Sequence, residues 1–190
     1  MGAAPIDAEV LACTNAAQWE SWLADHQARS SGIWLLIAKK GSNQVSVTIS
    51  DALDVALCYG WIDSQRKGHD ADYYLQRYSR RRPGSPWSRL NVERVEALTA
   101  AGCMQARGLA EVAAAQADGR WAAAYQPQRE ATLPPDFAAA LERNERARAA
   151  FEQLDKTGQY VIILPVLKAS NPAIRLMRLQ KAIAKLEPPS

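Results

Sequence analysis

Large apolar side chains recur at helical spacing near the start of the chain. Four residues follow the i, i+3, i+4, i+7 pattern of an amphipathic helix: Trp19, Trp22, Leu23 and His26. Thr14 is the expected N-cap of that helix. The apolar run IWLLIA at 33–38 follows, bounded by glycine and lysine. Because it is short and β-prone, it predicts a strand that is covered on both faces.

The next segment continues the predicted sheet. Residues 45–47 form a possible short return strand. Thr48 and Asp51 then have the spacing of a capping box, and the helix that they open ends at Gly60. Residues 61–68 and 73–79 are predicted as two strands joined through an acidic turn.

The second half of the chain has helical patterning. Ser85 is the expected cap of a helix with Pro86 at its first position, and Gly102 ends it. Further helices are expected at 106–118, over roughly 136–154, and from 171 to about 186, with a proline-rich loop at 126–135. Residues 158–169 fit either a strand or a helix kinked by Pro165; the helical surroundings favour the helix.

These elements predict an α+β fold. A small antiparallel sheet with covering helices occupies the N-terminal half, and an all-helical half follows. We expect a single domain over 1–190, with an α+β part at 1–90 and a helical part at 91–190. A chain of 190 residues, 48% of them hydrophobic, can bury a core without disulfides or a structural metal.

Cysteine content and apolar patterning indicate in which cellular compartment the protein is expected. The three cysteines, Cys13, Cys58 and Cys103, are odd in number and far apart, which favours a reducing compartment over a disulfide framework. No segment approaches the roughly 18–20 apolar residues of a membrane span. The N-terminus also lacks the basic and apolar regions of a signal peptide. The sequence therefore predicts a cytoplasmic protein.

Charge is concentrated in one stretch, Cys58–Asn91, which we call the basic segment. It holds seven basic residues against three acidic ones, and six of the fourteen aromatic residues of the chain. The net charge of the whole chain is only +3. Arginine and aromatic side chains gathered beside turn residues indicate a binding surface for an anionic partner.

Five arginines dominate this segment: Arg77, Arg80, Arg81, Arg82 and Arg89. The planar guanidinium group binds carboxylate or phosphate in bidentate fashion. Ser85, Ser88 and the predicted helix start would add donors and a partial positive charge. Three interpretations remain open: a solvated basic loop, a site for a small anion or nucleotide, and a nucleic-acid surface.

The other polar and aromatic residues of the segment allow two interpretations each. Trp61 and Trp87 can be core anchors or stacking platforms. Asp70 and Asp72 fit a turn or, with Asp63, a group of carboxylates for acid–base work or for holding Mg²⁺ through phosphate. Asp63 lies inside a predicted strand, where aspartate is disfavoured, so it is either a structural ion pair with an arginine or an acid–base group.

Cofactor chemistry has no motif to support it. Cys58 and His69 have no spacing that enforces a nucleophile–base pair, and Cys58 is expected to be structural. The sequence holds no zinc spacing and no phosphate-binding glycine motif, so no metal and no cofactor are predicted.

The last helix has two faces. A basic face, Arg175, Arg178, Lys181 and Lys185, opposes an apolar face, Leu176, Leu179, Ile183 and Leu186. We expect the apolar face to pack on the body and the basic face to be solvated. Docking on nucleic acid or a membrane surface is the alternative.

Several blocks along the chain resemble one known family. They are GIWL at 32–35, ALCYGWIDSQ at 56–65, YLQRY at 74–78, SPWSRLN at 85–91, GRW at 119–121, AY at 124–125 and KA at 168–169, with Arg175 and Arg178. These blocks resemble the YdeI/OmpD-associated, or bacteriocin-protection, family over nearly the whole chain. The resemblance implies a bacterial protein linked to envelope stress, with no established reaction, substrate or cofactor.

The leading hypothesis is a binding protein of stress protection that holds an anionic ligand. The predicted ligand-binding residues are Trp61, Asp63, Gln65, Arg77, Arg80, Arg81, Ser85, Trp87, Ser88, Arg89 and Asn91. One alternative is an enzyme on a phosphorylated or carboxylated small molecule, with Asp63 as the catalytic acid or base. Another is a protein–protein interaction module, which a large exposed apolar patch would indicate.

Overall fold

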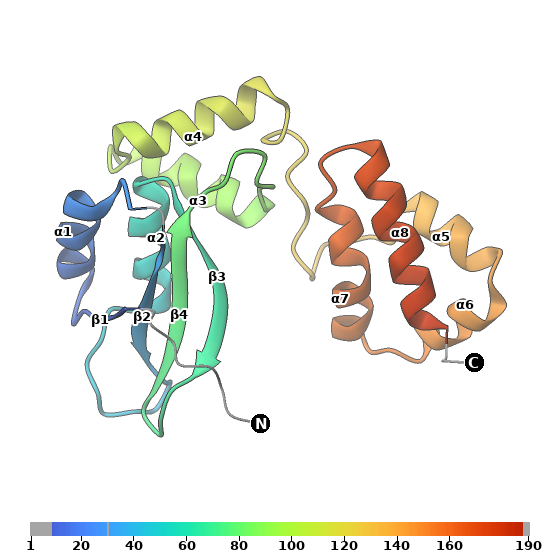
Figure 1. The fold of residues 1–190 in the computed structure, drawn as a ribbon, viewed down its shortest axis with the longest axis horizontal. Helices are drawn as coiled ribbons and strands as arrows, with labels where there is room; N and C mark the ends of the chain where they lie inside the picture. The colour runs from blue at the N-terminus through green and yellow to red at the C-terminus, as the bar shows by residue number, and fades with distance from the viewer. Residues whose placement is uncertain (1–8, 30, 188–190) are drawn as a thin grey trace. The chain divides into compact units, whose positions relative to one another are not determined.

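The computed structural model describes residues 9–29 and 31–187 (Figure 1). Its contacts divide the chain into two compact units. Unit 1 comprises residues 1–83 and 94–114, and unit 2 comprises residues 84–93 and 115–190. The expected α+β class is confirmed, whereas a single domain over 1–190 stays a prediction.

Unit 1 is built on a four-stranded sheet in the order β1-β2-β4-β3. The strands and helices of this part are β1 (Val10–Ala12), α1 (Ala16–His26), β2 (Ile33–Ala38), α2 (Ile49–Cys58), β3 (Trp61–Gly68) and β4 (Tyr73–Arg80). β2 pairs antiparallel with β4 from Ile33 opposite Tyr78 to Ala38 opposite Tyr73. The sheet is mixed, because the unpredicted β1 lies parallel to β2.

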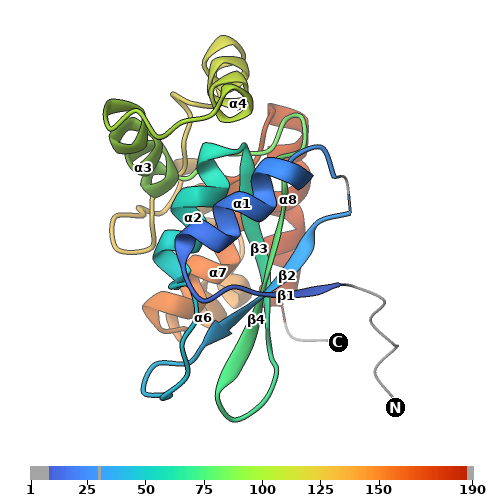
Figure 2. The same ribbon diagram turned by 90° about the vertical axis from the view of Figure 1, so that its left-hand side faces the viewer.

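One face of the sheet carries the core of unit 1, and α1 and α2 cover it (Figures 1 and 2). Alternate β2 residues, Ile33, Leu35 and Ile37, pack in the same apolar cluster as Trp19 of α1. On the opposite face Trp34 is buried, but Leu36 and Ala38 are only half-buried, so the predicted covering of both faces is complete only on the face toward α1 and α2.

Three boundaries of the predicted elements were wrong. The cap of α1 is Asn15 rather than Thr14, because Asn15 Oδ1 accepts a hydrogen bond from Gln18 N at 3.0 Å. Residues 45–47 form no strand; both edges of β2 are already occupied by β1 and β4.

The helix predicted to start at Ser85 begins at Arg89 instead. α3 runs Arg89–Ala100, and α4 follows at Ala106–Ala117. Trp87 O accepts a hydrogen bond from Tyr125 N at 3.0 Å, and Arg89 N donates to Tyr125 O at 2.9 Å. Ser88 is thereby held in a parallel bridge with Tyr125, so the helix begins after Ser88 and Pro86 is not its first residue.

Unit 2 is mainly a group of four helices with its own apolar core. They are α5 (Pro135–Glu142), α6 (Glu145–Glu152), α7 (Lys156–Leu167) and α8 (Pro172–Leu186). Phe137 and Phe151 lie at its centre with ring centroids 5.5 Å apart. The ambiguous segment 158–169 is helical through Pro165, which confirms the preferred interpretation. Within the described residues, no helix is both long and apolar enough to cross a membrane.

The faces of α8 agree with the prediction at five positions: Leu179, Ile183 and Leu186 pack in the core of unit 2, and Lys181 and Lys185 are exposed. The other three positions differ. Leu176, expected on the packed side, is 58% exposed, and Met177 beside it is 59% exposed. Arg175 and Arg178, expected in solvent, are half-buried and donate to Val166 O at 3.2 Å and Pro165 O at 2.9 Å. These two arginines satisfy carbonyl groups at the end of α7, which rotates the buried stripe toward them.

Candidate functional site

The arginines at one end of the sheet in unit 1 bind backbone carbonyls. Arg77 Nη2 donates to Ser31 O at 2.7 Å and Arg80 Nη1 donates to Ala28 O at 3.4 Å. Arg107, from α4, donates to Gln27 O at 2.6 Å. These carbonyls follow the end of α1, where unpaired oxygens and the negative end of the helix dipole favour cations. Arg77 and Arg80, both predicted to bind an anion, therefore each bind a backbone carbonyl between α1 and β2.

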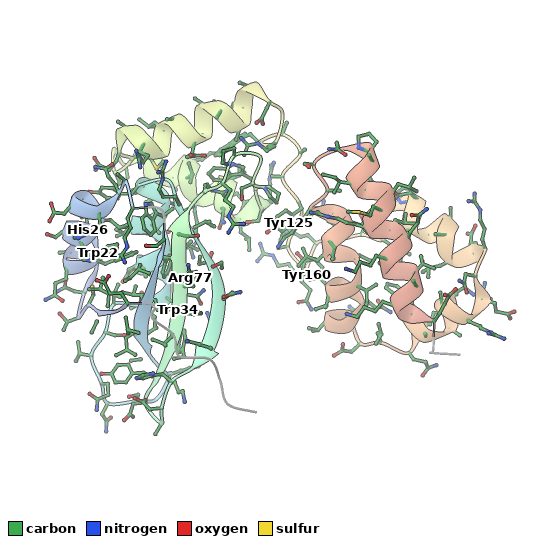
Figure 3. The ribbon with its side chains drawn as sticks, viewed as in Figure 1. Trp22, His26, Trp34, Arg77, Tyr125 and Tyr160 are labelled. Carbon is green, nitrogen blue, oxygen red and sulfur yellow. The ribbon has the colours of Figure 1, made fainter. Side chains whose placement is uncertain are left out.

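Cations also cover the aromatic ring on the outer face of the sheet. Lys67 Nζ lies 4.4 Å from the centroid of the Trp34 ring. The Arg77 guanidinium, labelled beside Trp34 in Figure 3, lies 5.7 Å from the same centroid. Trp34 is only 7% exposed. A nucleic-acid base needs an accessible aromatic face on which to stack. Trp34 offers none in this arrangement.

Trp61, a predicted ligand contact, is a core residue. Its side chain is fully buried, packs edge-on against Trp22, and donates from Nε1 to Gln27 O at 3.4 Å. Gln65 has an exposed side chain, and its carbonyl accepts from Gln76 Nε2 at 3.1 Å. Arg81 is 5% exposed. Of these three predicted residues, only Gln65 presents its side chain to solvent.

Asp63 lies on β3 directly opposite Tyr78 and beside a β-bulge that ends at Arg66. It is half-buried. Burial raises the pKa of Tyr78 and the charge of Asp63 raises that pKa further, so the phenol stays neutral at all ordinary pH values. The bulge disrupts the regular ladder next to Asp63 and bends the strand there.

The other carboxylates and the buried cysteine of this region have structural roles. Asp70 Oδ1 accepts from Tyr73 N at 2.7 Å and Asp72 N at 2.8 Å, and the Tyr73 bond in particular lowers the pKa of Asp70. Asp70 is thus the expected turn residue. Burial raises the pKa of Cys58 to about 11, so its thiol is protonated at neutral pH and a poor nucleophile.

The remaining predicted residues belong to unit 2. Ser88 Oγ accepts from Asn91 N at 3.2 Å, which caps the first turn of α3. Arg89 Nε lies 3.5 Å from Glu93 Oε1 one helical turn later. The predicted set is therefore divided between units, with Trp61, Asp63, Gln65, Arg77, Arg80 and Arg81 in unit 1 and Ser85, Trp87, Ser88, Arg89 and Asn91 in unit 2.

Unit 2 contains a cavity of about 150 Å³. Three stretches that are far apart in sequence line it: Gly84, Pro86 and Trp87; Asp118–Arg120 with Ala123; and Leu167–Ser170. Its charged lining residues are Asp118, Arg120 and Lys168. The wall thus combines two cations, one carboxylate and apolar surface from Trp87 and Leu167.

Arg120 is fixed in this wall by three acceptor atoms. Its Nε donates to the two Asp118 carboxylate oxygens at 2.9 and 2.7 Å, and its Nη1 donates to Ser85 O at 2.8 Å. The Arg120 hydrogen bond is the main reason why the pKa of Asp118 lies below its usual value. The guanidinium is therefore positioned before any ligand arrives.

Lys168 approaches the cavity from the end of α7, where it is the C-cap residue. Its Nζ lies 5.0 Å from the centroid of the Tyr125 ring. Trp87 packs edge-on against Trp121 with centroids 4.8 Å apart, so the apolar part of the wall is also held by ring contacts.

A second, larger groove of about 380 Å³ lies next to the cavity. Ala123 and Leu167 line both hollows. Tyr125 lies in the wall of the groove, and Tyr160 donates to the adjacent Gln126 O at 3.0 Å (Figure 3). The two hollows form neighbouring parts of one surface of unit 2.

Sequence reasoning missed Arg120 and Lys168. Each is an isolated cation in a segment without charge clustering, and only the folding of unit 2 brings them together. The one available signal was that GRW at 119–121, KA at 168–169 and SPW at 85–87 belonged to the blocks that carried the family resemblance.

Comparison with known families divides the chain. Residues 11–111, more than half of the chain, match a family described as a domain of unknown function (DUF8412). The chain belongs to that family. Residues 130–188 match the family described as bacteriocin-protection, YdeI or OmpD-associated, which confirms the expected resemblance for the C-terminal part.

The resemblance does not extend over the whole chain as expected. The GWIDSQ and SPWSRLN blocks lie within the range that matches the domain of unknown function. No curated protein and no solved structure matches the chain. Within the described residues, no three histidine, cysteine or carboxylate side chains are grouped as a metal site would need.

Proposed function

We propose that this chain binds a small anionic ligand in the cavity of unit 2, with Lys168 and Arg120 as its cationic groups. The observation that carries the proposal is the composition of the cavity wall, in which two cations and one carboxylate lie beside buried Trp87. An excess of positive charge in a partly enclosed space favours a negatively charged group more strongly than the same charge in open solvent.

The geometry of the two cations supports this function. Arg120 is already oriented by Asp118 and Ser85 O, so little side-chain entropy is lost when a ligand binds. Lys168 Nζ rests over Tyr125, which limits its motion in the same way. A carboxylate or phosphate group matches the donors that such side chains present.

The size of the cavity sets the class of ligand. About 150 Å³ accommodates a group of a few heavy atoms and excludes a nucleic-acid strand. Trp34, one of the aromatic residues on the outer sheet face of unit 1, is covered by cations. We therefore favour a small anion over nucleic acid as the partner.

The biological role that we propose is protection of bacteria against stress, with the bound anion as signal or cargo. Its basis is the word bacteriocin-protection in the description of the family that matches residues 130–188, together with the link to stress that the resemblance implies. The cytoplasmic location predicted from the sequence remains part of this proposal, and cell fractionation with an antibody to the chain tests it.

Titration of the whole protein with sodium acetate and with inorganic phosphate at low salt tests the binding function. Heat of binding and the fluorescence of the tryptophans provide two independent readouts. We expect Lys168→Gln to weaken binding by about tenfold or more, because hydrogen bonds to charged groups contribute roughly 1.5–3 kcal/mol. Lys181→Gln, an exposed lysine of α8, is the matched control and should leave the affinity unchanged.

Two results would overturn the proposal. One is a wild-type protein that binds neither anion. The other is a loss of binding in Arg77→Gln with full binding in Lys168→Gln, because that pattern would place the site in the basic segment.

Two other hypotheses from the sequence retain their own tests. An enzyme that uses Asp63 should lose activity in Asp63→Asn, and a screen of phosphorylated and carboxylated substrates would reveal it. An interaction module should dock through exposed apolar residues, and Leu176 and Met177 are adjacent on α8 at 58% and 59% exposure. Leu176→Ser would then abolish partner binding without changing the fold.

A further inference from the structure

The groove beside the cavity provides space for a part of the ligand other than its anionic group. Ala123 and Leu167 belong to the walls of both hollows, so the two hollows are neighbours on one surface of unit 2. Ala122, Ala123 and Ala124 contribute to the groove, and their small side chains leave the space open.

The walls of the groove are mostly apolar. Tyr125, Pro134, Pro135 and Leu167 line it together with the three alanines. Its single basic lining residue, Arg175, forms a two-pronged ion pair with Asp136, from Nε to Oδ2 at 2.6 Å and from Nη2 to Oδ1 at 2.7 Å. The pair neutralises that guanidinium, just as Asp118 neutralises Arg120 in the cavity. The groove therefore favours an uncharged group, whereas the positive charge of Lys168 remains in the cavity wall.

The two volumes support a ligand with two parts. Ligand pockets usually enclose about 300–1,000 Å³. The cavity alone, at about 150 Å³, is below that range, whereas the groove, at about 380 Å³, is within it. A charged head in the cavity and an apolar tail in the groove would use both spaces.

We infer that the ligand is an amphipathic monocarboxylate, whose head binds beside Lys168 and Arg120 and whose hydrocarbon or aryl tail lies along the alanine-lined groove. This inference rests on the proposed anion-binding function. It adds the tail and therefore the chemical class: a medium-chain or aryl-substituted organic acid rather than inorganic phosphate or a sugar phosphate.

The test is a homologous series of straight-chain acids, acetate, butanoate, hexanoate and octanoate, titrated into the whole protein. Burial of a methylene group favours binding by about fourfold when fully desolvated. Because the groove is open on one side, we expect a gain of roughly twofold to fourfold per added methylene. Hexanamide, which has the same tail and a neutral head, should bind at least about tenfold more weakly than hexanoate.

A variant that fills the groove isolates the contribution of the tail. Ala122 lines the groove and not the cavity, so Ala122→Phe should abolish the gain with chain length and leave the affinity for acetate unchanged. Ala117→Phe, at an exposed position of α4 that lines neither hollow, is the control and should retain the full gain.

The outcomes separate the inference from the function on which it rests. Equal affinity for acetate and octanoate in the wild type, with binding still dependent on Lys168, would refute the tail and leave anion binding intact. Equal affinity for hexanamide and hexanoate would refute the anionic head and, with it, the proposed function. A chain-length gain that survives in Ala122→Phe would place the tail outside the groove and contradict the inference.

Discussion

Cationic side chains serve different purposes in the two units. In unit 1, Arg77 and Arg80 lie in the most basic stretch of the sequence, yet they donate to backbone carbonyls that follow α1. In unit 2, Arg120 and Lys168 lie in unremarkable sequence and line a cavity. The density of charge along a chain is therefore a poor guide to where charge is available for a ligand.

The physical reason lies in what surrounds each cation. The chain that follows a helix end offers carbonyl oxygens, and in unit 1 Arg77, Arg80 and Arg107 each donate to one of them. In the cavity wall of unit 2, Lys168 Nζ lies 5.0 Å from the centroid of the Tyr125 ring. The comparison can be tested by substitutions that act on one unit and should spare the other.

The largest expected effect is on the core of unit 1. Trp61→Ala removes a fully buried indole and should lower the free energy of unfolding by about 3–5 kcal/mol. Urea denaturation followed by circular dichroism measures it. Val45→Ala, at an exposed position, should change stability by less than about 0.5 kcal/mol. A stable Trp61→Ala protein that had lost anion binding would show instead that this tryptophan contacts ligand.

Enlarging a small residue should lower the stability of the protein in unit 1 and the affinity for ligand in unit 2. A Cβ atom on Gly108 would lie 2.2 Å from Cys58 O, so Gly108→Ala forces α4 away from the end of α2. We expect a loss of about 1–3 kcal/mol. Ala123→Val, beside open space in unit 2, should leave the free energy of unfolding nearly unchanged and reduce ligand affinity. Equal thermal stability of Gly108→Ala and wild type would contradict the close contact.

Removal of a carbonyl-binding arginine should affect folding and not binding. Arg77→Gln loses the hydrogen bond to Ser31 O and should cost about 1 kcal/mol of stability. Its affinity for acetate should equal that of the wild type. Arg82→Gln, at an exposed position just after β4, is the control for a change of net charge and should alter neither quantity. A loss of acetate affinity in Arg77→Gln but not in Arg82→Gln would show that Arg77 takes part in anion binding as well as in folding.

Patterns of periodicity predicted most of the fold. The apolar run at 33–38, the capping box at Thr48 and the two strands of the hairpin match β2, α2, β3 and β4 closely. What failed depended on partners distant in sequence. β1 is three residues long and exists through its pairing with β2, and Ser85 does not start a helix because Tyr125 pairs with the chain beside it.

The candidate site was less predictable than the fold for the same reason. Only Gly84, Pro86 and Trp87 of the cavity wall fall inside the basic segment. Arg120 lies 33 residues and Lys168 lies 81 residues after Trp87 in the sequence, and no local pattern connects them. Composition located a charged stretch, whereas long-range packing determines which charges line a hollow.

The smallest expected effect is electrostatic and belongs to unit 2. The hydrogen-bonded Arg175 guanidinium lowers the pKa of Asp136, so the ion pair stabilises the fold at neutral pH. Both side chains are more than a third exposed, and solvent screening limits the contribution to at most about 1 kcal/mol. Because the folded pKa is depressed, this stability is fully present above the unfolded pKa near about 3.9 and is lost as pH falls through the folded pKa.

Asp136→Asn cannot titrate and therefore tests this pair. The difference in free energy of unfolding between wild type and Asp136→Asn should be positive at pH 7 and shrink as the pH falls from about 4 toward 2. Glu152→Gln, which removes a carboxylate held by Arg148 only at 4.0 Å, is the matched control and should show a smaller difference. A difference that is unchanged at low pH would mean that Asp136 stabilises the start of α5 by shape and hydrogen bonding. The charge of Asp136 would then not be what neutralises Arg175 beside the groove.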